Sequence, residues 1–333
     1  MIPLSLLDLA TIVTGGTPSQ ALEETTEMAN LAERLGMTRL WVAEHHGMEG
    51  IASSAPAVLI AHLAAATTTL RVGSGGVMLP NHAPLVVAEQ FGTLEALHPH
   101  RIDLGIGRAP GTDLRTARAL GRGNANHFPD QLVELLGYFT GASEQLAMPG
   151  RGSMPEIWLL GSSTFSAQLA GMLGLPFGFA YHFSPEPLDE AVALYRSMFK
   201  PSAVLAEPKV LVVVSVLCAP TTEEAEFLAG SGRLGMLLLR QGRPTTLPSP
   251  QDAASYSYSE SERAEIHHAS ASHLVGDPDL VAKGLQQLVE RTQADEIMLS
   301  TRVFGLAERR RSVELTVAAW EQQAAAQLES VRG

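Results

Sequence analysis

The sequence predicts a (β/α)8 barrel, the TIM-barrel fold, formed by a single domain over residues 1–333. Segments with strand and helix character alternate from one end of the chain to the other, which predicts a mostly parallel sheet with helices packed outside it. Apolar residues make up 45 % of the chain and charged residues 17 %, enough for a sizeable core. The run VLVVVSVL at 210–217 is continuously apolar, as is typical of a strand covered on both faces.

Eight strands and nine helices account for most of the chain. The predicted strands are 4–10, 40–43, 70–78, 102–106, 157–160, 177–181, 210–217 and 297–300. The predicted helices are 21–35, 55–67, 84–97, 129–139, 166–173, 188–199, 222–239, 280–290 and a C-terminal helix within 307–333, at about 308–328. Pro84 is suited to a first helical position, and Gly36 and Gly174 are suited to positions just past a helix end.

One stretch interrupts this alternation. Residues 240–272 are polar, contain Pro244, Pro248 and Pro250, and show little periodicity. An insertion of this length without secondary structure in a compact domain is usually either a functional lid or disordered. The sequence leaves these two alternatives open.

Composition excludes several classes of function. The net charge of −12, with no block of basic residues, disfavours binding to nucleic acid or to anionic membranes. Cys218 is the single cysteine, so neither a disulfide framework nor a thiolate metal cluster is expected, which fits a cytoplasmic protein. The apolar N-terminus contains Asp8 and lacks a basic leader, and no apolar run reaches the ~18 residues of a membrane span.

The most informative stretch is RIDLGIGRAPG at 101–111. A predicted strand ends there in two glycines, Gly105 and Gly107, and Arg108 follows at once. In parallel barrels, ligands bind at the carboxyl ends of the strands. A guanidinium at this point can make a bidentate contact with a phosphate or carboxylate. The alternative is a tight turn followed by a surface arginine.

The next strand is followed by a second candidate anion site. Gly161, Ser162 and Ser163 open a predicted helix, with Ser166 one turn further on. Backbone N–H groups and hydroxyls at a helix start bind anions, although serine there is also an ordinary N-cap. Together with Arg108 on the neighbouring strand end, this loop is predicted to hold one phosphate.

Glu44, His45 and His46 follow the second strand. A zinc site needs at least three suitable ligands, and adjacent histidines on a strand point to opposite sides. We therefore expect no metal here. One histidine acting as an acid, a base or a hydrogen-bond donor fits better, and a histidine that only fixes a loop is the structural alternative.

Three other strand ends contribute candidates. Gly75 and Gly76, in the run GSGGV, indicate either a barrel bend or a place where a flat ring approaches the backbone. His182 follows the sixth strand and Thr301 the eighth, and we expect both to line a substrate pocket.

Taken together, these motifs resemble the bacterial luciferase-like family of flavin-dependent monooxygenases. The resemblance covers nearly the whole chain and is weakest over 241–272. It is carried by WVAEHH at 41–46, the run from Val72 to Gly111, WLLGSS at 158–163 and the block 275–311.

The resemblance implies reduced FMN lying across the carboxyl-end mouth of a barrel. Arg108 and the Gly161 loop with Ser162, Ser163 and Ser166 would hold the flavin phosphate. A non-proline cis peptide between Gly75 and Gly76 would lie beneath the isoalloxazine ring. His45 would be the active-site histidine at the reacting face, with Glu44 beside it.

The expected activity is a monooxygenase that uses O2 and reduced FMN, supplied by a separate reductase, on a small organic substrate. A reactive cysteine of some family members is replaced by Gly107, and the long mobile loop of light-emitting members is not recognisable. A deazaflavin-dependent hydride-transfer dehydrogenase and a non-catalytic flavin-binding barrel are the alternatives. The resemblance also implies a homodimer formed through the second and third helices. The substrate is not predicted.

Overall fold

The computed structural model describes residues 2–243 and 245–332, with side chains described as far as residue 326. It confirms the barrel. Within this part the strands are β1 (Leu4–Asp8), β2 (Arg39–Val42), β3 (Arg71–Met78), β4 (Ile102–Gly107), β5 (Glu156–Gly161), β6 (Phe177–Phe179), β7 (Val210–Cys218), β8 (Leu274–Gly276) and β9 (Glu296–Ser300). Strands β1 to β7 pair in parallel in chain order except that β9 is inserted between β7 and β1, which closes the ring. Strand β8 lies outside the ring and extends only the end of β7.

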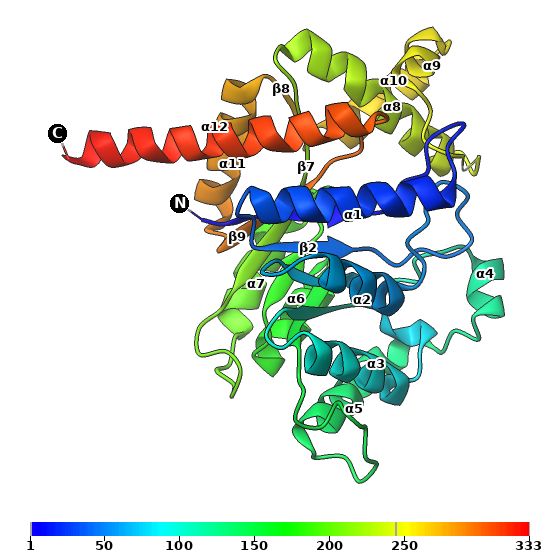
Figure 1. Ribbon diagram of the computed structural model, residues 1–333, viewed down its shortest axis with the longest axis vertical. Helices are drawn as coiled ribbons and strands as arrows, with labels where there is room; N and C mark the ends of the chain where they lie inside the picture. Colours follow the sequence, from blue (N-terminus) through cyan, green and yellow to red (C-terminus); the bar gives the residue numbers. More distant parts are fainter. Residues whose placement is uncertain (1, 244, 333) are drawn as a thin grey trace.

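Helices surround this ring (Figure 1). The α-helices described are α1 (Pro18–Arg34), α2 (Pro56–Ala66), α3 (Pro84–Leu97), α4 (Leu114–Ala119), α5 (Phe128–Thr140), α6 (Thr164–Leu173), α7 (Leu188–Met198), α8 (Thr222–Arg240), α9 (Pro250–Ser255), α10 (Glu260–Ser270), α11 (Pro278–Thr292) and α12 (Leu306–Arg332). Figure 1 shows α8, α9 and α10 grouped at one end of the molecule.

Local signals explain where several helices begin and end. The Thr17 hydroxyl accepts the N–H of Gln20, and the Gln20 side chain bonds back to the Thr17 N–H, so a capping box starts α1. Gly36, just past the end of α1, has a φ of +67°, and Gly174, which ends α6, has a φ of +62°. Only glycine adopts this left-handed conformation at little cost, so both glycines end their helices as predicted.

The interior of the barrel is filled by a compact apolar cluster. It consists of Leu7, Trp41, Trp158, Leu211, Val213 and Met298. The rings of Trp41 and Trp158 meet edge to face with their centroids 5.5 Å apart. Because side chains alternate along a strand, this layer fixes which residues further along each strand point into the mouth of the barrel.

A buried charge network closes the opposite, N-terminal end of the barrel, and the sequence analysis did not predict it. Arg39 donates to Asp103 at 2.7 Å and to Glu296 at 2.9 Å, and Arg71 also pairs with Asp103. The indole of Trp41 donates to Asp103 at 2.9 Å. Burial lowers the pKa of Arg39, but the surrounding carboxylates more than offset this and raise the pKa above its usual value.

Residues 241–272 do not lack regular structure, so the expectation of a structureless segment is wrong. Helices α9 and α10 form there, and each begins with a capping box, Ser249 with Asp252 and Ser259 with Glu262. These short polar helices carry too few apolar residues to produce a clear period, which is why the periodicity missed them. Pro244 lies outside the described residues.

No helix in the described ranges is both long enough and apolar enough to cross a membrane.

Candidate active site

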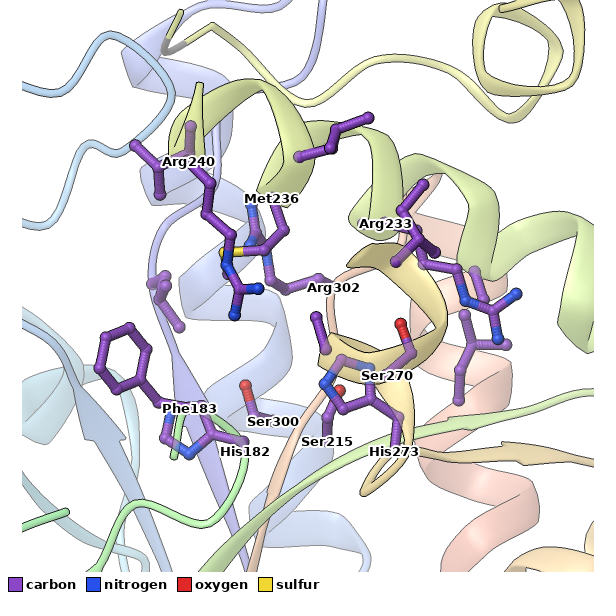
Figure 2. Close-up of a pocket in the computed structure, with 18 of the residues that line it drawn as sticks. His182, Phe183, Ser215, Arg233, Met236, Arg240, Ser270, His273, Ser300 and Arg302 are labelled. Atoms are coloured by element: carbon purple, nitrogen blue, oxygen red, sulfur yellow. The ribbon is translucent and has the colours of Figure 1, made fainter. Parts of the chain in front are cut away.

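A cavity of about 190 Å³ opens between the carboxyl ends of the strands and helices α8 and α10. Figure 2 shows its wall, with Met236 and Arg240 extending from α8 on one side and Ser215 and Ser300 lying on the strand side. The polar lining residues are His45, His182, Ser215, Arg233, Arg240, Glu265, Ser270, His273, Ser300 and Arg302. Residues of the 240–272 segment therefore contribute to the wall.

Strand alternation explains which side chains reach this cavity. Met298 lies in the interior cluster, so Ser300 and Arg302, two and four residues further on, face the same way. The same alternation in steps of two residues relates Trp41 in β2 to His45, which lies just past the end of β2. Glu44 and Thr301, each one position away from these residues, are not among the lining residues.

His45 lines the cavity and is anchored on its far side. Its Nδ1 lies 3.2 Å from the carbonyl oxygen of Gly111. A carbonyl only accepts hydrogen bonds, so Nδ1 carries the proton and Nε2 of the neutral ring is an acceptor. Burial lowers the pKa of His45, and the charge of Arg302 lowers it further, so the neutral form is favoured.

Glu44 faces away from the cavity, which corrects the expectation that it acts beside His45. It is fully buried. Its carboxylate accepts from His46 and His82 at 2.9 Å and from the Met78 N–H at 3.1 Å. Burial raises the pKa of Glu44, but these bonds, led by His82, bring it below the ordinary value. Strand alternation is the physical reason: neighbouring side chains point to opposite faces, so Glu44 holds loops together.

Of the two residues predicted to line the substrate pocket, one lines the cavity and one does not. His182 lines the cavity, where burial lowers its pKa to about 4. Thr301 is buried but is not among the lining residues, so the structure corrects that expectation. The next residue, Arg302, lines the cavity where Thr301 was expected. His273, just before β8, also lines the cavity, and burial lowers its pKa to about 4 as well. Arg302 follows the same strand as Thr301 in the sequence, but only Thr301 was expected in the pocket, and His273 was not predicted.

The structure brings Arg108 to the start of α6. Its guanidinium carbon lies 4.1 Å from the ring centroid of Phe165, the second residue of that helix. Ser163 is the N-cap residue, yet its side chain makes no capping bond, so the first turn keeps unpaired N–H donors. Among the described residues, Arg108 forms no ion pair.

The loop after β4 also connects this cation with His45. Only two residues, Ala109 and Pro110, separate Arg108 from Gly111, whose carbonyl anchors His45. Arg122 donates to the carbonyl oxygen of Arg108 at 2.7 Å and to Asn81 at 2.8 Å, which fixes the loop. The candidate phosphate ligand and the candidate catalytic ring are therefore positioned by one short segment.

The glycines of the predicted site are required by close packing. A Cβ on Gly161 would lie 2.5 Å from the Ser166 side chain, so the chain turns from β5 into α6 only with glycine there. Ser166 is accordingly buried beneath the turn, whereas Ser162 and Ser163 are partly exposed. The Gly75–Gly76 peptide is cis, as the resemblance implies. A Cβ on Gly76 would approach the carbonyl oxygen of Gly105 to 2.6 Å.

These residues fit a phosphate-bearing flavin. The uncapped start of α6 presents oriented N–H donors, the Ser162 and Ser163 hydroxyls lie beside them, and Arg108 supplies a positive charge. Helix start, hydroxyls and cation together match the donor set that a dianionic phosphate requires.

The fold and this site define a parallel barrel whose functional side chains gather at the carboxyl ends of the strands. Residues 3–296 match the model of the luciferase-like monooxygenase family, and the chain belongs to that family. A luciferase-like monooxygenase of Escherichia coli (strain K12) is 48 % identical over 322 residues, covering 95 % of this chain and 96 % of that protein.

Two further relatives support this assignment. The N-acetyl-S-alkylcysteine monooxygenase of Bacillus subtilis (strain 168) is 35 % identical, over 95 % of this chain and 97 % of that protein. The crystal structure of apo-MsnO8 superposes with a TM-score of 0.87 at 35 % identity, covering 96 % of this chain and 99 % of that one.

More distant structures share the fold alone. The oxygenating constituent of 3,6-diketocamphane monooxygenase from the CAM plasmid of Pseudomonas putida, solved in complex with FMN, has a TM-score of 0.70 at 20 % identity and covers 95 % of this chain and 96 % of its own. An F420-dependent secondary alcohol dehydrogenase has a TM-score of 0.67 at 14 % identity and covers 95 % and 99 %. The same barrel fold therefore occurs in a protein solved with FMN and in an F420-dependent enzyme.

Proposed function

We propose that this protein is an FMN-dependent monooxygenase acting on a small organic substrate. The observation that carries the proposal is the loop 108–111, which brings an arginine to an uncapped helix start and anchors a cavity-lining histidine. Arg108, Ser162 and Ser163 would hold the phosphate of FMN. When bound, reduced FMN supplies the electrons that activate O2 for insertion of one oxygen atom into the substrate.

His45 is proposed to handle one proton at Nε2. Its Nδ1–H is engaged by Gly111, so the neutral ring offers Nε2 as the acceptor. The lowered pKa keeps this nitrogen free of a proton near neutral pH. The ring donates from Nε2 only after it has taken up a proton, so His45 would accept a proton and return it.

The walls around His45 favour a dry reaction site. Leu9, Ile51, Val216 and Met236 line the cavity beside it. Apolar walls exclude water from reactive species and strengthen the electrostatic interactions inside. The separate reductase and O2 as co-substrate, which the family implies, belong to this proposal, as does the cytoplasmic location expected from the single cysteine.

A homodimer is a further part of the proposal. Val58 on α2 is 72 % exposed and Val86 on α3 is 45 % exposed. Helices α2 and α3 lie side by side, as Figure 1 shows. Apolar side chains on adjacent exposed helices suit an interface between two copies of the chain.

The experiment that tests the cofactor is a titration of purified apoprotein with FMN, reduced FMN and deazaflavin coenzyme, followed by absorbance and fluorescence. We expect reduced FMN to bind most tightly, with micromolar affinity or better. Binding of deazaflavin alone would favour the hydride-transfer dehydrogenase instead. Flavin binding without oxygen-dependent turnover of any compound in a broad substrate panel would favour the non-catalytic barrel.

A further inference from the structure

We propose that the cavity binds a small organic anion, with its carboxylate or equivalent acid group held by Arg302 and its apolar part held against α8. The inference deepens the proposed function, on which it rests, by naming the substrate class. It arises from the charge of the cavity wall.

Arg302 is a largely buried cation without a partner. Its Nε is inaccessible to solvent and makes no hydrogen bond, and no ion pair joins its guanidinium to any carboxylate in the described part of the chain. Burial lowers the pKa of Arg302, and no carboxylate acts to offset this. An unpaired buried charge is costly, so its presence at a cavity surface points to a ligand of opposite charge.

Several other arginines of this chain, unlike Arg302, form ion pairs with carboxylates. Arg39 donates to Asp103 at 2.7 Å, and Arg309 donates to Asp8 at 2.6 Å. On the cavity wall itself, Arg233 pairs with Glu226, and Arg240 lies 3.9 Å from Glu265. On this cavity wall, a carboxylate therefore lies near Arg233 and near Arg240, whereas Arg302, on the strand side, has none among the described residues.

The lining residues of the cavity carry more positive than negative side chains. Glu265 is the single carboxylate among the lining residues, and Arg240 lies beside it. The buried Nδ1 of His182 and Nε of Arg233 are further polar atoms of the wall that make no hydrogen bond in the described structure. Nη2 of Arg302 lies 3.8 Å from where a Cβ on Gly235 of α8 would stand, and Met236 of the same helix also lines the cavity, so the cation adjoins this helix and its apolar lining. A molecule with an acid group at one end and an apolar group at the other matches this arrangement.

The anion site is separate from the proposed phosphate site. Arg302 follows β9, whereas Arg108 follows β4, and these two strands are four places apart in the ring of eight, on opposite sides. Neither Arg108 nor any residue of α6 is among the lining residues of the cavity. A flavin phosphate at α6 would therefore leave Arg302 available.

The test uses hexanoate and its neutral analogue hexanamide as probes, with binding to the apoprotein measured by calorimetry. We expect the wild type to bind hexanoate at least tenfold more tightly than hexanamide. Arg302→Gln should reduce this preference to twofold or less, whereas Arg302→Lys should keep part of it. The matched control, Arg240→Gln, removes a cavity arginine that already has a carboxylate nearby and should keep the preference.

Stability gives a second measurement. Because an unpaired buried cation is removed, the melting temperature of Arg302→Gln should equal or exceed that of the wild type. Equal binding of the two probes by the wild type, or an unchanged preference in Arg302→Gln, would overturn the inference. FMN affinity is measured on the same proteins: if the wild type discriminates the probes but binds no flavin, the proposed function fails and the anion site stands.

Discussion

The guanidinium carbon of Arg108 lies 4.1 Å from the centre of the Phe165 ring, so the cation that follows β4 rests on the first turn of α6. Stacking on an aromatic face holds a guanidinium in place while leaving its N–H edge free to bind an anion.

Arg108→Gln is therefore expected to weaken FMN binding through the phosphate. Loss of a charge-assisted hydrogen bond costs about 2 kcal/mol, roughly thirtyfold in the dissociation constant. Riboflavin has no phosphate, so its affinity should be unchanged, and the ratio of the two affinities, measured by fluorescence titration, isolates the effect. Arg263→Gln is the matched control, because Arg263 stacks on Tyr258 away from α6. An unchanged ratio in Arg108→Gln would place the phosphate elsewhere.

The protonation of His45 can be measured directly by NMR of protein with labelled histidine, using His45→Gln for assignment. We expect the neutral Nδ1–H tautomer at pH 7 and a pKa below 6.5. Because the charge of Arg302 opposes protonation of His45, Arg302→Gln should raise this pKa. Observation of the Nε2–H tautomer would contradict the role assigned to His45.

Folding stability should decrease as the solution is acidified below pH 6.5. His182 and His273 have pKa values lowered to about 4 in the folded protein, against 6.5 when unfolded. Between these values the unfolded chain binds more protons, so stability is retained above pH 6.5 and is lost as the pH falls toward 4. Urea unfolding at pH 7.5 and pH 5 should show a loss of about 1 to 2 kcal/mol for each histidine.

The double variant His182→Asn with His273→Asn is the comparison for that measurement. It should lose less stability between the two pH values than the wild type does. His62→Asn, which changes a histidine on the outer face of α2, should behave as the wild type. Equal acid sensitivity in the wild type and the double variant would show that other groups are responsible.

The buried network at the base of the barrel should dominate stability without affecting the site. Asp103→Asn leaves Arg39 and Arg71 without their shared carboxylate, so the free energy of unfolding should fall by about 3–5 kcal/mol. Asp189→Asn removes an exposed pair with Arg291 and should cost less than about 1 kcal/mol. Chemical unfolding measures both. A comparable loss in the two variants would contradict the importance of burial.

The proposed homodimer predicts a particle of about twice 35.4 kDa in light scattering at micromolar concentration. Charges placed on α2 and α3 should disrupt it, so Val58→Glu combined with Val86→Glu is expected to run as a monomer. Val133→Glu, which changes an exposed valine on α5, should remain dimeric. A monomeric wild type would remove this part of the proposal.

Local sequence determined the architecture because each element depends on short-range patterns. The apolar run of β7, the glycines ending α1 and α6, and the cation following β4 are all readable within a few residues, and together they gave the barrel and the strand ends that bear its site. The polar helices α9 and α10 escaped because capping, not apolar periodicity, marks them.

Tertiary structure alone decided which of two adjacent residues faces the cavity. Glu44 and His45, or Thr301 and Arg302, are equivalent candidates in the sequence, but a one-residue step along a strand reverses the direction of the side chain. The positions of Trp41 and Met298 in the barrel interior set this direction, and those positions depend on the closed barrel. The missing partner of Arg302 likewise depends on residues distant in sequence that do not come near it, which no local pattern records.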